Sequence, residues 1–170
     1  VATTELAAAY FQAVLTVALG VVALQLYHRY QKAYFRNWAL AWGIYVLRLG
    51  AIIVFLHTGR PVWLYWHQVF TGWTALALLW AALVFAQQIR WKDRYWILVL
   101  FPAVWSYAAI YRLDNFLLAA GPAVLFLSAA TMATAWAFFR YHRETSSNAA
   151  RVLAVFLALW ALHHLDYPFL

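Results

Sequence analysis

The sequence predicts an all-α fold: a polytopic membrane bundle of six transmembrane helices, formed by a single domain over residues 1–170. Hydrophobic residues make up 68% of the chain and charged residues only 10%, whereas soluble domains average about 45–50% apolar and about 25% charged residues. The apolar runs continue for about 20 residues, which is the length of a membrane-spanning helix. They do not alternate with polar residues as the strands of a membrane barrel do.

Six apolar spans follow one another along the chain, at residues 6–27, 34–56, 61–86, 95–111, 116–139 and 149–170. A helix rises 1.5 Å per residue, so each span can cross a hydrocarbon core of about 30 Å, and the fourth lies near the lower limit. The connections between the spans are short, and we therefore expect consecutive helices to pack as antiparallel neighbours.

Individual spans carry further features of membrane helices. The first has small residues at helical spacing, a pattern typical of close helix packing: Ala9, Ala13, Thr16 and Gly20. Tryptophan and tyrosine flank the third and fourth spans at the positions expected of aromatic belts. The fourth and fifth spans contain Pro102 and Pro122, and the sixth ends in the polar run HHLDYP, residues 163–168.

Basic residues are concentrated in alternate connections. Nine of them occur in or beside the first, third and fifth connections: Arg29, Lys32, Arg36, Arg90, Lys92, Arg94, Arg140, Arg143 and Arg151. The second holds only Arg60, and the fourth only Arg112 beside Asp114. The positive-inside rule then places the N-terminus outside and the end of the sixth span outside. The net charge of +7 thus indicates topology, and we expect no nucleic-acid partner.

Histidines occur at matching depths in two spans. At 1.5 Å per residue, His67 lies roughly 9 Å inside the outer boundary, and His163 and His164 lie about 9–10 Å inside it. Polar groups at this depth are costly and are candidates for a functional site. His67 shares a helical face with Thr71 and Thr74. His57 ends the second span near the outer surface.

The polar run of the sixth span offers several candidate ligands. Asp166 and Tyr167 lie within one helical turn of His163. His163 and His164 are separated by about 100° around a helix axis, so only one can face a given partner. The i, i+4 spacing aligns His164 with Trp160, but the sequence leaves the choice between the two histidines open.

Arg48 is a charged residue near the middle of the second span. A charge at this depth costs roughly 2.5–3.5 kcal/mol on insertion scales, so we expect it to have a partner or to reach water. Its helical face also carries Trp38, Trp42 and Tyr45. Asp166 or Asp114 could pair with it. The sequence is equally compatible with a structural lock, in which Arg48 forms an ion pair with one of these aspartates, and with a ligand clamp, in which Arg48 binds a ligand.

Several ligands are compatible with these residues. Two imidazoles from different helices can bind haem b axially, or can contribute to a metal site formed by His67 and His164, with His57 as a further ligand. Alternatively, a histidine together with Tyr167 or Asp166 could donate hydrogen bonds to the carbonyls of a quinone in the outer leaflet. The sequence contains no cysteine and no phosphate-binding loop, nucleophile elbow or zinc-protease motif. We therefore expect no enzyme activity from this segment.

The runs HHLDYPFL (163–170) and YFRNWALAWGIYVLRL (34–49) resemble the multi-pass N-terminal sensor region of bacterial sensor histidine kinases and diguanylate cyclases. The resemblance implies a homodimeric sensory input domain of a signal-transduction protein, multi-pass in the bacterial inner membrane. In such proteins a further helix and a kinase or cyclase output domain follow, so we expect the chain to be truncated before them.

We therefore expect a membrane-embedded sensor that detects a ligand or redox signal through an outer-leaflet site of His67, His163 or His164, Asp166, Tyr167 and Arg48. Its expected partners are the lipid bilayer and a small-molecule, haem or quinone ligand. A haem- or quinone-binding redox protein is the first alternative. A small transporter is the second, although ion pathways usually contain acidic residues within several helices.

Overall fold

The computed structural model describes residues 2–86, 92–113 and 115–165, and these residues form helices joined by short turns. The α-helices are α1 (Ala2–Tyr30), α2 (Ala33–Thr58), α3 (Pro61–Phe85), α4 (Trp96–Tyr107), α5 (Phe116–Thr145) and α6 (Asn148–His163). A 3₁₀ turn, η1 (Asp93–Tyr95), precedes α4, and a π-helical turn, η2 (Ala108–Arg112), follows it. Within the described residues, each predicted span therefore corresponds to helical structure, the fourth to α4 together with η2 and the sixth as far as His163.

Four of the helices are long and apolar enough to cross a membrane: α1, α2, α3 and α5. The apolar helix 96–112, formed by α4 and η2, and α6 are shorter. The predicted sixth span extends to residue 170, and its last five residues lie outside the described part of the chain. The predicted fifth span was too short, because α5 continues to Thr145 and so carries Arg140 and Arg143 on its last turns.

Three turns use a residue in the left-handed conformation. Gln31 (φ 53°), Gly59 (φ 63°) and Ser146 (φ 55°) each donate their backbone N–H at 2.7 Å to a carbonyl in the last turn of the preceding helix. The next helix then begins within a few residues. Asn115 and Ser147 cap α5 and α6 by accepting hydrogen bonds from backbone N–H groups with their side chains. Such caps satisfy N–H groups that a helix leaves without partners.

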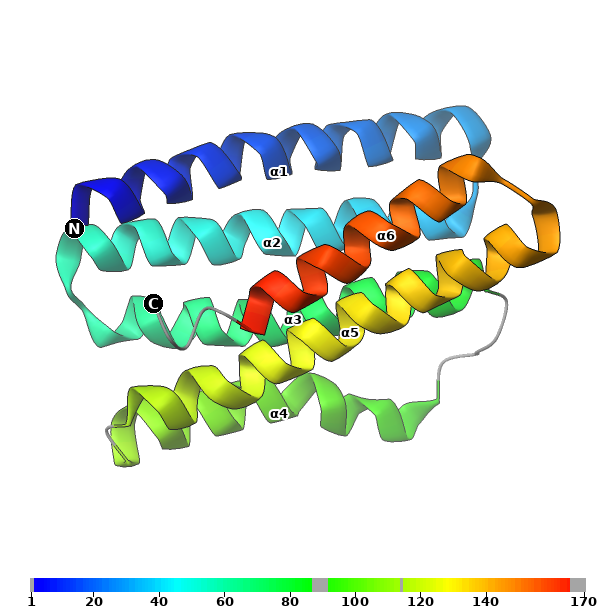
Figure 1. Cartoon of the computed structure of the whole chain (residues 1–170). Coiled ribbons are helices and arrows are strands. Elements are labelled where there is room, and N and C mark those ends of the chain that lie inside the picture. Colours follow the sequence, from blue (N-terminus) through cyan, green and yellow to red (C-terminus); the bar gives the residue numbers. More distant parts are fainter. Residues whose placement is uncertain (1, 87–91, 114, 166–170) are drawn as a thin grey trace.

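The helices are antiparallel, and their turns alternate between the two ends of the bundle (Figure 1). The α1–α2 and α5–α6 turns lie at one end, with Lys32, Arg143 and their basic neighbours; we call this the basic end. The α2–α3 and α4–α5 turns lie at the opposite end. The described basic residues are thus distributed between the two ends as the charge pattern of the connections indicated.

Helix α3 is at the centre of the fold and packs against α2, α4 and α5. Helix α6 packs mainly against α5, and α1 packs against α2. Stacking of Trp42 on Trp160, with ring centroids 5.5 Å apart, brings α6 back to α2. The helices α2, α3, α5 and α6 therefore form a four-helix core, with α1 and α4 on its periphery.

The small-residue face of α1 packs within the chain. Ala9, Thr16 and Ala23 are buried, and a Cβ added to Gly20 would lie 3.5 Å from Cβ of Trp42 on α2. The predicted close packing of this face is thus found against α2. The same face is not available for contact with a second copy of the chain.

Candidate functional site

Reciprocal hydrogen bonds join α2 to α3 around Arg48. Nε of Arg48 donates to Oγ of Thr71 at 2.9 Å, and this hydroxyl in turn donates to the carbonyl oxygen of His67 at 2.7 Å. Nδ1 of His67 donates to the carbonyl oxygen of Arg48 at 3.2 Å. All three residues are buried. We call this set, Arg48, His67 and Thr71, the α2–α3 clasp.

The clasp forms because Arg48 on α2 lies at the same level along the bundle as His67 and Thr71 on α3. Thr71 lies four residues after His67, so both side chains occupy one face of α3. That face meets the face of α2 on which Arg48 lies. A threonine hydroxyl can donate and accept at once, which allows Thr71 to bind both the guanidinium and its own helix.

Aromatic rings connect the clasp to α6. The guanidinium carbon of Arg48 lies 4.8 Å from the centre of the Tyr45 ring, a cation–π contact. The Tyr45 ring lies 6.0 Å from Trp160, and Trp160 lies 5.3 Å from the imidazole of His164. Side chains from three helices thus form one continuous cluster.

The structure distinguishes the two adjacent histidines of α6. His164 is buried at 8% exposure, whereas His163 is exposed. The i, i+4 alignment of Trp160 with His164 is therefore the alignment that points into the bundle. His67 donates to the carbonyl oxygen of Arg48, and the rings of Tyr45 and Trp160 link the guanidinium of Arg48 to His164. Arg48, His67 and His164 thus belong to one neighbourhood.

Nε2 of His164 is buried and has no hydrogen-bond partner among the described residues. Leaving a buried polar atom without a partner costs about 1–3 kcal/mol, and such atoms in native proteins call for an explanation. Asp166 and Tyr167, which we expected beside it, lie outside the described residues, as does Asp114. Within the described part of the chain, no carboxylate forms an ion pair with Arg48.

His57 is separate from this cluster. Its Nε2 lies 3.4 Å from the hydroxyl of Tyr10, at an exposed position where α2 meets α1. Among the described residues, no three histidine or carboxylate side chains are close enough together to hold a metal ion. His57, His67 and His164, the candidate metal ligands, therefore do not form a metal-binding group.

The surroundings of the two buried imidazoles fit haem poorly. Axial ligation requires both rings on opposite sides of a flat slot. The guanidinium of Arg48 and the rings of Tyr45 and Trp160 connect His67 to His164, and a porphyrin placed between the imidazoles would have to displace them. Arg48 has N–H donors beyond the one bound to Thr71.

The structure buries other polar residues that the sequence patterns did not single out. Gln68 is 2% exposed, next to His67, and its depth in an apolar span was the available signal. Ser128 of α5 donates to the carbonyl oxygen of Ala161 on α6 at 2.7 Å. Thr131 and Thr134 on α5 are fully or almost fully buried. Their hydroxyl groups donate hydrogen bonds to backbone carbonyl oxygens of the same helix, so these residues contribute to packing.

Comparisons of the chain with models of known protein families, with curated proteins and with solved structures found no match.

Proposed function

We propose that this chain is the membrane-embedded sensory input region of a bacterial signal-transduction protein, and that the cluster of Arg48, His67 and His164 detects its signal. The observation that supports this best is the buried Nε2 of His164, which has no hydrogen-bond partner among the described residues, on a ring that Trp160 and Tyr45 link to the buried guanidinium of Arg48. The resemblance of the HHLDYPFL and YFRNWALAWGIYVLRL runs to sensor regions of histidine kinases and diguanylate cyclases supports the same proposal.

The proposed topology has six crossings in the inner membrane, with the N-terminus outside. Antiparallel helices with alternating turns support it, as does the grouping of lysine and arginine at the basic end. With this orientation the cluster lies in the outer half of the membrane. A homodimer is the expected assembly, and its interface would use a surface other than the small-residue face of α1.

The packing of α6 makes it the element that can respond to a signal. It is held to α5 by helix packing and by the hydrogen bond of Ser128. Its connection to α2 depends on large side chains, chiefly the Trp42–Trp160 stack. A ligand that binds Arg48 and His164 together would change how α6 sits against α2. Conformational change then follows from the ligand's different affinity for the two positions of α6.

The chemistry of the cluster favours a ligand with hydrogen-bond acceptors and an apolar body. The guanidinium of Arg48 presents a fork of N–H donors that suits a carboxylate or a carbonyl oxygen. Nε2 of His164 can donate or accept, depending on its tautomer. Tyr45, Trp42 and Trp160 supply aromatic walls. A quinone or an aromatic carboxylate combines these features.

A signalling chimaera tests the proposal. Residues 1–170 would be joined through one added transmembrane helix to a cytoplasmic diguanylate cyclase domain, and cyclic dinucleotide would be measured in cells. We expect Arg48→Met and His164→Ala each to change the output at least about five-fold, because about 1 kcal/mol of lost coupling corresponds to this factor. Arg112→Gln, at an exposed arginine of the end opposite the basic end and outside the cluster, is the matched control.

Equal output from the wild type, the two site variants and the control would refute the sensory role, provided that membrane levels are equal. The alternative of a redox protein makes a different prediction. If the chain binds haem b, the purified protein shows a Soret band that is lost in both His67→Ala and His164→Ala. If the purified protein shows no Soret band but releases a bound quinone into organic solvent, the result favours the sensory proposal with a quinone as the ligand.

A further inference from the structure

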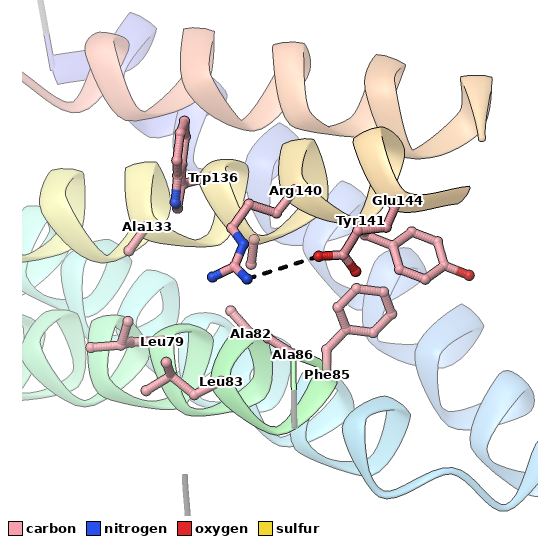
Figure 2. A pocket seen from close by; sticks show the side chains of 11 residues that line it. Leu79, Ala82, Leu83, Phe85, Ala86, Ala133, Trp136, Arg140, Tyr141 and Glu144 are labelled. Carbon is pink, nitrogen blue, oxygen red and sulfur yellow. Dashed lines mark ion pairs between the residues drawn. The ribbon is translucent and has the colours of Figure 1, made fainter. Parts of the chain in front are cut away.

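A groove lies between α3 and α5 at the basic end of the bundle (Figure 2). Its volume is about 440 Å³, within the usual range for ligand pockets. Small or apolar side chains line most of it: Leu79, Ala82, Leu83 and Phe85 on α3 and Ala133 and Ala137 on α5. None of the residues of the α2–α3 clasp lines this groove, so it is a separate site.

The apolar part of the groove covers part of one leaflet of a bilayer. On α5 it runs from Ala133 to the charged mouth at Arg140, which is about 10 Å along the helix at 1.5 Å per residue. Half of a 30 Å hydrocarbon core is about 15 Å. The groove runs along the helices from the basic end, where headgroups would lie, and has the length to hold the first part of an acyl chain.

The mouth of the groove carries one positive and one negative side chain. Nη2 of Arg140 lies 3.8 Å from Oε1 of Glu144, and both side chains are largely exposed, at 49% and 65%. Figure 2 shows the guanidinium over the space between α5 and α3, with Tyr141 and Glu144 further towards the end of α5. The guanidinium has five N–H donors, so the contact with Glu144 leaves others for a second anion.

A second, almost entirely apolar cavity lies between α3 and α4. It is about 230 Å³ in volume, with Trp80, Tyr95 and Leu98 among its lining residues. Leu79 and Leu83 line both this cavity and the groove. Two apolar spaces on either side of the same two leucines fit a molecule with two hydrocarbon chains.

We propose that this groove binds one phospholipid whose headgroup carries both a phosphate and a primary ammonium, as in phosphatidylethanolamine. The phosphate accepts hydrogen bonds from Arg140, and the ammonium donates to Glu144. The acyl chains lie on the two sides of Leu79 and Leu83. The opposite charges at the mouth complement this headgroup, whereas a purely anionic headgroup would also face the carboxylate of Glu144.

Native mass spectrometry of the purified, delipidated chain tests the proposal. The chain would be titrated with phosphatidylethanolamine, phosphatidylcholine and phosphatidylglycerol of identical acyl chains. We expect one molecule of phosphatidylethanolamine to bind at least about three-fold more tightly than the other two, the factor expected for one partly exposed ion pair. Equal affinity for the three lipids, or a preference for phosphatidylglycerol, would overturn the proposal.

Variants locate the site. Glu144→Gln should abolish the preference for phosphatidylethanolamine, Arg140→Gln should weaken binding of all three lipids, and Ala133→Leu should block the groove. The matched controls are Arg143→Gln, an exposed arginine of the same helix end, and Ala129→Leu, about one turn from Ala133 and outside the groove lining. Both controls should bind like the wild type. Unchanged lipid binding in Glu144→Gln and Ala133→Leu, with melting temperatures equal to the wild type, would refute the assignment.

Discussion

Substitution of Gly72 by alanine should force α4 away from α3. A Cβ at this position would lie 2.6 Å from both Cβ and Cγ of Pro102, whereas carbon atoms in contact are usually about 3.5–4.0 Å apart. The proline ring is part of the backbone of α4 and cannot rotate aside. The two helices must therefore separate by about 1 Å at this point.

The magnitude follows from three contributions. Overpacking a well-packed site costs about 1–3 kcal/mol. Nε1 of Trp73, next to Gly72, donates to the carbonyl oxygen of Val99 on α4 at 2.8 Å, and a further 1 Å would break this bond, at about 1 kcal/mol. Alanine has a helix propensity about 0.8–1.0 kcal/mol better than glycine, which offsets the lost bond. We expect a net loss of about 1–3 kcal/mol in the free energy of unfolding.

Unfolding by sodium dodecyl sulfate in mixed micelles, followed by tryptophan fluorescence, measures this loss. Gly50→Ala is the matched control, because Gly50 lies inside α2 and a Cβ there would have no atom within 4 Å. The control should be unchanged or more stable by up to about 1 kcal/mol. If Gly72→Ala proved as stable as Gly50→Ala, the close approach of α3 to α4 would be wrong.

Three further predictions concern the clasp, the packing of α6 and the topology. A double-mutant cycle of Arg48→Met and Thr71→Val should give a coupling energy of about 1–2 kcal/mol, at the upper end for membrane helices; a coupling near zero would contradict the clasp. Ser128→Ala should lower the free energy of unfolding by about 1 kcal/mol in the same micelle assay, and an unchanged value would mean that the bond to Ala161 contributes nothing. The chain contains no cysteine, so single cysteines can be labelled with an impermeant thiol reagent in intact cells. Labelling is expected at Thr58 and Leu113 but not at Lys32 and Thr145, and the reverse pattern would invert the proposed orientation.

The sequence predicted the helices because apolar runs and short polar connections depend on local composition alone. It also identified Arg48, His67 and Thr71 as polar residues at membrane depth. It could not predict that Thr71, and not a carboxylate, would bind the guanidinium. That pairing depends on the register of α2 against α3, which composition and periodicity do not encode.

The choice between His163 and His164 illustrates the same limit. The i, i+4 spacing showed that Trp160 and His164 share a face of the helix. Which face of α6 turns inward depends on its packing against α5, through Ser128 and the carbonyl group of Ala161. Only the assembled structure shows that the face with His164 is buried and that His163 is exposed.

The groove between α3 and α5 was not foreseen because the predicted fifth span ended at residue 139. Arg140 then appeared to belong to a connection, where it was counted only as a topological charge. Because α5 continues to Thr145, Arg140 lies on a helix face that meets α3. Two charges one helical turn apart, followed inward by alanines at Ala137 and Ala133, were the signal in the sequence.

The energetics of the clasp bear on whether the cluster is a lock or a ligand site. Placing Arg48 in the membrane costs roughly 2.5–3.5 kcal/mol. A hydrogen bond to a charged group stabilises by about 1.5–3 kcal/mol, and a cation–π contact such as that with Tyr45 by about 0.5–2 kcal/mol. Thr71 and Tyr45 together are therefore sufficient to hold the guanidinium, and Arg48 alone does not require a ligand. His164 is different, because its buried Nε2 has no hydrogen-bond partner among the described residues. His164, and not Arg48, is thus the residue that calls for a ligand, and the His164→Ala chimaera therefore tests the sensory proposal more directly than Arg48→Met does.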